Sequence, residues 1–232
     1  VSIRAGRLQN NLVKRCRHQA LMASGAELTA NEVYVDSYAN NAFALGGLKV
    51  RGNFAFGTGY HVCGTGWGSD RQFVDNFIHL KAVKPLGRFS EYGERSTMVG
   101  MRFTIYGEGT DKYENTLHQG NVVCVYAADG GEARGIQWST GRNTANRVFK
   151  DNLVKAVAMD DKSTAATFEL EGNFKYADEL MPMVYENCTL IGSTYLLQFG
   201  AGNPGGSNHQ LHNCKLERTG SDERFKTLRF PQ

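Results

Sequence analysis

The segment RVFKDNLVKAV, Arg147–Val157, contains the pattern that decides the fold of this 232-residue chain. Hydrophobic residues lead into polar residues and an Asn, and further hydrophobic residues follow. The pattern returns in QFVDNFIHLKAV, MVYENCTLI and QLHNCKLE. Alignment of the chain on this Asn gives the positions Asn11, Asn31, Asn53, Asn76, Asn121, Asn152, Asn187 and Asn213. Repetition of so short a unit predicts a solenoid, in which neighbouring units bury one another's hydrophobic residues.

Each repeat divides into three short strands. One leads into the Asn, a second follows it, and a third lies before a Gly, as in GIQWSTG and TFELEG. Helices are excluded because the hydrophobic spacing is two and because Gly or Asn interrupts every candidate. The long gap from Asn76 to Asn121 divides evenly if Gly100 holds the vacant position. The sequence therefore predicts an all-β, right-handed parallel β-helix of about nine coils, forming a single domain over residues 1–232.

The repeated Asn has a physical explanation in such a fold. Stacked strands lie ~4.8 Å apart, so one sequence position forms a column along the solenoid. We expect the Asn to occupy a sharp bend in the left-handed region and to hydrogen-bond from coil to coil. The next residue should then form an inward hydrophobic column, which Glu32 interrupts: Leu12, Phe54, Phe77, Met101, Val122, Leu153, Cys188 and Cys214. Cys188 and Cys214 are expected to be packed thiols, with a disulfide as the alternative.

The composition excludes several classes of function. The 26 basic and 23 acidic residues are evenly spread and give a net charge of only +3, so no nucleic-acid partner is expected. No hydrophobic run approaches the ~20 residues of a membrane span. The five cysteines lack zinc-ligand spacing, and the histidines form no recognisable triad with Ser and Asp. Because the chain begins without Met and inside a repeat, we expect a processed protein or part of a longer one.

The Asn-centred repeat resembles that of the pectate-lyase-like superfamily of parallel β-helices along nearly the whole chain. That superfamily includes polysaccharide lyases, several glycoside hydrolase families, uronan epimerases and phage tailspikes. The resemblance rests on structural positions, so it implies a fold more directly than an activity. It also implies a secreted, extracellular or periplasmic protein. In the superfamily's enzymes the substrate lies in an outer groove over the strand that corresponds here to the strand before the Gly.

The outward side chains of these strands are the candidate site. With Ile136, Phe168 and Leu197 placed inward, the outward column is Gln137, Glu169, Gln198 and Arg229. Glu171 shares the face of Glu169, with the two Cα atoms ~6.6 Å apart. Two carboxylates this close suit a general acid and base, or a cation site. The alternative is that these polar residues are ordinary solvated surface.

The resemblance gives the carboxylate pair a second role. Glu169 and Glu171 resemble the calcium-binding carboxylates of alginate- and chondroitin-type lyases, where Lys and Arg act as base and acid. Lys175 and Arg229 would take those places here. No cofactor other than such a calcium ion is expected. The hydrolase and lyase hypotheses both remain open at this stage.

Two aromatic residues outside these strands are further candidates for sugar contact. Trp67, in the Gly-rich stretch YHVCGTGWGSD, would offer a stacking platform for a pyranose ring, or would pack in a turn. Tyr92, in FSEYGER, is a second candidate binding residue. Long insertions flank the repeat that contains Glu169, and solenoids build binding walls from such loops.

The first functional hypothesis is a polysaccharide lyase or glycoside hydrolase that acts on an extended glycan. Its catalytic residues would be Glu169, Glu171 and Arg229, and its substrate contacts would be Gln137, Gln198, Lys175, Trp67 and Tyr92. The alternative is a non-catalytic glycan-binding, adhesive or tailspike-like β-helix. A tailspike should have a long hydrophobic outer face for trimerisation. The inward assignment of the column after the Asn leaves no such face, and this favours the enzyme.

Overall fold

The computed structural model describes residues 2–3, 6–16, 19–36, 43–58, 71–82, 97–104, 113–139, 144–171, 183–199, 209–220, 223 and 225–229, and within them the secondary structure is strands and turns. Sheet A consists of β1 (Ser2–Ile3), β2 (Arg7–Gln9), β4 (Gln19–Thr29), β6 (Phe43–Arg51), β8 (Gln72–Val74), β11 (Tyr113–Gln119), β14 (Thr144–Lys150), β17 (Met183–Glu186) and β20 (His209–His212). Sheet B consists of β3 (Leu12–Cys16), β5 (Glu32–Asp36), β7 (Phe54–Thr58), β9 (Phe77–Ala82), β12 (Val122–Ala127), β15 (Leu153–Ala158), β18 (Thr189–Gly192) and β21 (Lys215–Arg218). Sheet C consists of β10 (Thr97–Thr104), β13 (Glu132–Ser139), β16 (Thr164–Glu171), β19 (Tyr195–Phe199) and β22 (Lys226–Arg229).

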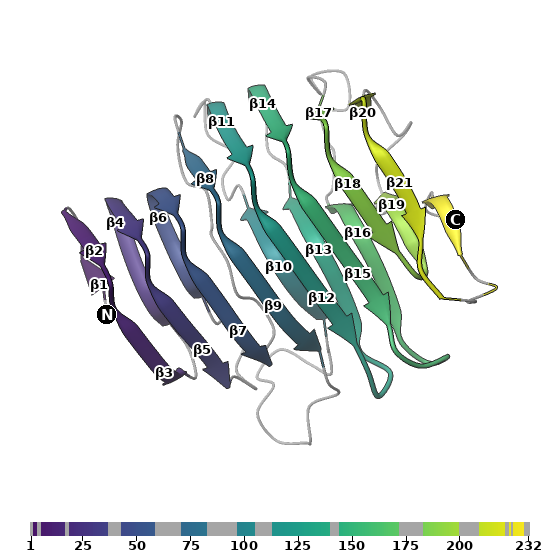
Figure 1. The fold of residues 1–232 in the computed structure, drawn as a ribbon, viewed down its shortest axis with the longest axis horizontal. Coiled ribbons are helices and arrows are strands. Elements are labelled where there is room, and N and C mark those ends of the chain that lie inside the picture. Colours follow the sequence, from purple (N-terminus) through teal and green to yellow (C-terminus); the bar gives the residue numbers. More distant parts are fainter. Residues whose placement is uncertain are drawn as a thin grey trace.

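From β8 onward the chain visits the three sheets in turn, and this order makes a solenoid. From β2 to β7 the described strands alternate between sheets A and B. β11, β12 and β13 belong to sheets A, B and C, and β14 then returns to pair with β11. Strands of successive coils pair in parallel, as in β12 with β15 and β13 with β16. Figure 1 shows the coils side by side from the N-terminal to the C-terminal end. The predicted all-β parallel β-helix with three strands per coil is confirmed.

The predicted position of Gly100 is wrong. Gly100 lies in β10 of sheet C, and the ladder passes directly from Asn76 to Asn121, where the side-chain amide of Asn76 donates to Asn121 Oδ1 at 2.9 Å. A Cβ atom on Gly100 would lie 2.4 Å from Val123 Cγ1. Glycine is required there for space, not for a bend. Sheet B accordingly has eight strands in the described residues, one for each of eight coils.

The hydrogen-bonded Asn ladder is confirmed at the corner between sheets A and B. Asn53 Nδ2 donates to Asn76 Oδ1 at 2.9 Å, and Asn121 Nδ2 donates to Asn152 Oδ1 at the same distance. Each of these amides also donates to a backbone carbonyl, as Asn121 does to Phe73 O at 2.9 Å. All four side chains are buried. The ladder therefore satisfies backbone groups that the corner would otherwise leave unpaired.

The left-handed bend lies one residue before the ladder, which corrects the predicted role of the Asn. The residues at this bend have φ between 52° and 64°: Asn10, Ala30, Gly52, Asp75, Gly120, Asp151, Asn187 and Asn213. Asn187 and Asn213 therefore belong to the bend column, and Cys188 and Cys214 occupy the ladder. The alignment on Asn is therefore one residue off in these two coils. Asn is accepted at the bend because it tolerates a positive φ, and in the ladder because its amide donates to backbone carbonyls.

The ladder cysteines are free thiols, as predicted. Cys188 Sγ donates to Phe149 O at 3.3 Å, and Cys214 Sγ donates to Tyr185 O at 3.4 Å. Burial is the main cause of a raised pKa for Cys188. Each thiol replaces an amide donor of the ladder, but neither offers the amide oxygen that links one Asn to the next.

The residue after the ladder faces outward in sheet B, so the predicted inward column is wrong there. Leu12 and Phe54 are 56% and 48% exposed. The ladder side chain already points into the core, and side chains alternate along a strand, so the next residue must point out. The buried column is formed by the second residue after the ladder: Val33, Ala55, Ile78, Val123, Val154 and Leu190.

The core is completed by a column of stacked rings from sheet A. The ring centroids of Phe73 and His118 lie 5.6 Å apart, those of His118 and Phe149 4.6 Å, and those of Phe149 and Tyr185 5.3 Å. Phe168 of sheet C meets Phe149 and Tyr185 edge-on at 5.9 and 5.4 Å. The interior is thus closed by aromatic contacts between sheets A and C.

We expect Asn121→Ala to destabilise the protein by about 3 kcal/mol, because it leaves several buried ladder groups unpaired. Asn121 Oδ1 accepts from the backbone N–H of Asn76 at 3.1 Å and from its side-chain amide at 2.9 Å. Asn11→Ala is the matched control, since Asn11 is only half-buried and donates to Gln9 O and Asn31 Oδ1. Its loss should stay below about 1 kcal/mol. Urea unfolding measures both, and equal losses would contradict a central role for the ladder.

Candidate functional site

The predicted column on sheet C exists. Gln137 pairs in register with Glu169, Glu169 with Gln198, and Gln198 with Arg229. Arg102 extends the column on the other side of Gln137. The expectation of solvated surface is wrong for its middle members, because Gln137, Glu169 and Gln198 are only 4%, 8% and 9% exposed. The column is therefore a buried polar cluster.

The remaining predicted site residues fall partly or wholly outside the described structure. Glu171 pairs in register with Ser139 at the end of β16, but its side chain and that of Arg229 lie outside the described part. Lys175, Trp67 and Tyr92 lie outside the described residues altogether. The predicted contacts of these five residues with a glycan or a calcium ion stay predictions.

Glu169 is the centre of the buried cluster. Its Oε2 accepts from Gln137 Nε2 at 2.6 Å, and its Oε1 accepts from Gln198 Nε2 at 2.9 Å. Arg134 Nε lies 3.1 Å from Oε1, and the Arg134 side chain is only 4% exposed. A second Arg134 nitrogen contacts Glu132 Oε2 at 3.1 Å. Two amide donors and a guanidinium thus surround the Glu169 carboxylate.

The carboxylate also sets the orientation of the two amides. Because both amide nitrogens donate to Glu169, both amide oxygens are turned away from it. Gln137 Oε1 and Gln198 Oε1 are buried and accept no hydrogen bond from the residues that the structure describes. Buried acceptors without a donor are costly, and a water molecule or a ligand hydroxyl would satisfy them.

This arrangement restricts the chemistry of Glu169. Two amides donate to the Glu169 carboxylate and Arg134 forms an ion pair with it, so its oxygens are already engaged within the protein. The Arg134 guanidinium beside it also opposes a cation at the same oxygens. Within the described residues, no cluster of three or more His, Cys, Asp or Glu side chains is placed to hold a metal ion.

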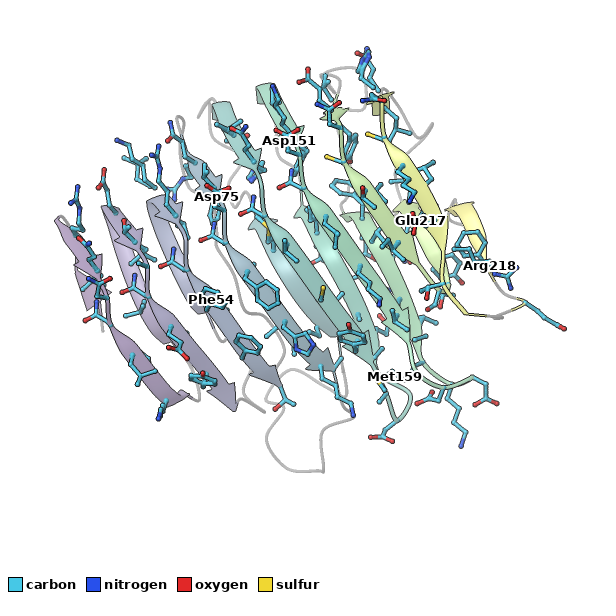
Figure 2. All side chains as sticks on the ribbon, in the orientation of Figure 1. Phe54, Asp75, Asp151, Met159, Glu217 and Arg218 are labelled. Carbon is cyan, nitrogen blue, oxygen red and sulfur yellow. The ribbon has the colours of Figure 1, made fainter. Side chains whose placement is uncertain are left out.

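A second surface, missed by the sequence analysis, covers the outer face of sheet B. We call it the aromatic strip, and it comprises Tyr34, Phe54, Phe56, Phe77, His79 and Tyr126. Phe54 stands on the open face of β7 in Figure 2. The ring centroids of Phe54 and Phe77 lie 5.4 Å apart, those of Phe56 and His79 5.6 Å, and those of His79 and Tyr126 5.1 Å. The rings of Phe54, Phe56, Phe77, His79 and Tyr126 therefore form a continuous row across three successive coils, and a sixth ring, Tyr34 on the preceding coil, stacks at 6.0 Å on Phe56.

The surroundings of the strip are mainly hydrophobic. Leu12, Val122 and Leu153 occupy the column of Phe54 and Phe77, in which the charged Glu32 stands between Leu12 and Phe54. Figure 2 shows Glu217 and Arg218 toward the C-terminal end of the face, and Glu217 forms an ion pair with Lys215 there. At the opposite end the Tyr34 hydroxyl donates to Glu32.

Cys124 lies beside the strip, in register with His79 and Lys155. Burial raises the pKa of its thiol, and the nearby Lys155 charge only partly opposes this. The pKa of the Tyr126 hydroxyl is also raised, again mainly by burial. A thiol with a raised pKa is a poor nucleophile at neutral pH. The strip thus has the character of a binding surface more than that of a catalytic centre.

Compared with known proteins, the chain matches no family model, no curated protein and no solved structure. In the described part of the chain, no helix is long and apolar enough to cross a membrane. The three parallel sheets and the Asn ladder support the resemblance to the superfamily only at the level of the fold.

We expect Arg134→Met and Glu169→Gln each to destabilise the protein by about 3 kcal/mol, because each removes one partner of a buried ion pair. The double variant should lose clearly less than the sum of the two, since it removes both charges. Arg7 and Glu27 provide the control, as an ion pair on sheet A with side chains 61% and 31% exposed. Coupling there should stay below about 1 kcal/mol. Additive losses in the Arg134–Glu169 cycle, measured by urea unfolding, would show that the two side chains act independently.

Proposed function

We propose that the protein is a non-catalytic β-helix that binds an extended glycan along the aromatic strip of sheet B. The observation that supports this most directly is the row of partly exposed rings on successive coils. Aromatic faces pack on the C–H groups of pyranose rings. Coils are spaced ~4.8 Å apart, so an extended glycan would advance by about one sugar for each ring it crosses. A protein with this role would meet its ligand outside the cell.

The strip also changes the balance between the two hypotheses drawn from the sequence. The absence of a hydrophobic outer face was the reason to favour an enzyme, and such a face is present. Leu12 and Phe54 are its most exposed described members. Exposed hydrophobic surface that continues over several coils is typical of interaction sites. The carboxylate assigned to catalysis, Glu169, is meanwhile buried and paired with Arg134.

Phe54→Ala combined with Phe56→Ala should weaken glycan binding about tenfold or more, because two stacking platforms are lost. Affinity electrophoresis on gels that contain neutral or acidic polysaccharides measures this loss. Met159→Ala is the control: Met159 is 58% exposed, follows β15 and lies outside the strip. Binding that survives the double variant unchanged would contradict the proposal. A monomer–dimer transition abolished by the same variant, with no glycan bound, would assign the strip to self-association instead.

Glycan cleavage at sheet C is a second candidate function. It is favoured by the Gln137–Glu169–Gln198 column, which lies where the superfamily's enzymes bind substrate and which has two unsatisfied amide acceptors. In this role the amide oxygens would accept from sugar hydroxyls. Glu169 would hold them in place, with Glu171 and Arg229 nearest the bond that breaks.

An activity screen with and without calcium tests the second candidate on neutral and uronic-acid polysaccharides. New reducing ends with ultraviolet absorbance from unsaturated sugars would indicate a lyase, and reducing ends alone a hydrolase. Glu169→Gln should abolish either activity, whereas Glu223→Gln, a change of an exposed carboxylate, should not. No product from any polysaccharide, in samples shown by thermal unfolding to be folded, would exclude cleavage of the tested substrates.

A further inference from the structure

Two lysines border the last ring of the aromatic strip. Lys81 of β9 pairs in register with Tyr126 of β12. Lys155 of β15, on the next coil, places its Nζ 6.0 Å from the centre of the Tyr126 ring. Lys81 is exposed and Lys155 is half-buried. Neither ammonium forms an ion pair in the described part of the structure.

The described acidic groups of this face are already engaged or belong to turns. Glu32 accepts the Tyr34 hydroxyl, and Glu217 is paired with Lys215. Asp129 and Asp160 follow β12 and β15 in exposed or half-exposed turns. The carboxylate of Asp160 accepts backbone N–H groups from Asp129, Lys162 and Ser163.

The region around Tyr126 therefore combines a flat ring with two cations that lack a carboxylate partner. An ammonium is a strong hydrogen-bond donor to carboxylate and sulfate oxygens. A neutral sugar would use the ring alone and leave both charges without compensation. An acidic sugar would use all three side chains together.

We propose that the bound glycan is acidic, with a carboxylated or sulfated sugar stacked on Tyr126 and its anionic group held by Lys81 and Lys155. This inference rests on the proposed function and names the ligand class of the same strip. Phe54, Phe56 and Phe77 would contact neighbouring sugars through their C–H faces. Affinity for the acidic chain then falls as salt is added, because the lysine contacts are near the surface and are screened.

The test compares three glycans with the same backbone: neutral, carboxylated and sulfated. Isothermal titration of the full chain at low and high salt measures each affinity. Lys81→Gln and Lys155→Gln should each weaken binding of an acidic glycan by roughly three- to tenfold, and the double variant should bind all three glycans with the same affinity. Lys162→Gln, which removes an exposed lysine from the turn after β15, is the matched control and should change nothing.

The outcomes separate this inference from the proposed function. Tighter binding of the carboxylated or the sulfated glycan, lost in the double lysine variant, supports the inference and identifies the anionic group that is recognised. Equal affinity for all three glycans would overturn the proposal of an acidic ligand. If the variant with Phe54→Ala and Phe56→Ala still binds them more weakly, the proposed glycan binding stands. No measurable binding of any of the three glycans would overturn both this inference and the proposed function.

Discussion

The corner between sheets A and B is the constraint on which the rest of the structure depends. Two successive residues define it, a left-handed residue such as Gly120 and a ladder residue such as Asn121. The ladder side chain must point inward, because its amide satisfies backbone groups inside the corner, as Asn121 does for Phe73 O. Strand alternation then fixes the orientation of every side chain that follows. Because the ladder side chain points inward, the next residue, the first of each strand in sheet B, faces outward.

The outer faces of sheets B and C show two different outcomes of this geometry. On sheet C the outward column is polar and buried, and Glu169 is engaged by Gln137, Gln198 and Arg134. On sheet B the outward column is aromatic and partly exposed, as Phe54 illustrates. A ligand of sheet B needs no rearrangement of side chains to reach the rings. A ligand at Glu169 has to enter a cluster whose polar groups already bind one another, although the amide oxygens of Gln137 and Gln198 and the Nε of Arg134 have no hydrogen-bond partner among the described residues.

The repeat was readable from the sequence because stacking applies the same requirement to one position in every coil. The same logic gave the register of Gln137, Glu169 and Gln198 correctly. The side of sheet B that each residue faces was not readable, because Asn is accepted both at the left-handed bend, as in Asn187, and in the ladder beside it. Burial of the sheet C column was beyond local reasoning as well, since burial depends on contacts distant in sequence. The strip becomes visible once the structure identifies buried positions such as Ile78 and Val123, because the residues that alternate with them face outward.

The outer face of sheet B also has a direction, which follows from the way charge changes along it. Toward the N-terminal coils the rings adjoin Glu32, whose carboxylate is bonded to Tyr34. Toward the later coils they adjoin Lys81 and Lys155 on either side of Tyr126. Phe54 and Phe77 lie between these charged groups, and Glu32 precedes Phe54 in the same column. A glycan lying on such a face would meet unequal surroundings at its two ends. Because the coils are related by translation and not by a two-fold axis, the two directions in which a glycan could lie on this face would not be equivalent.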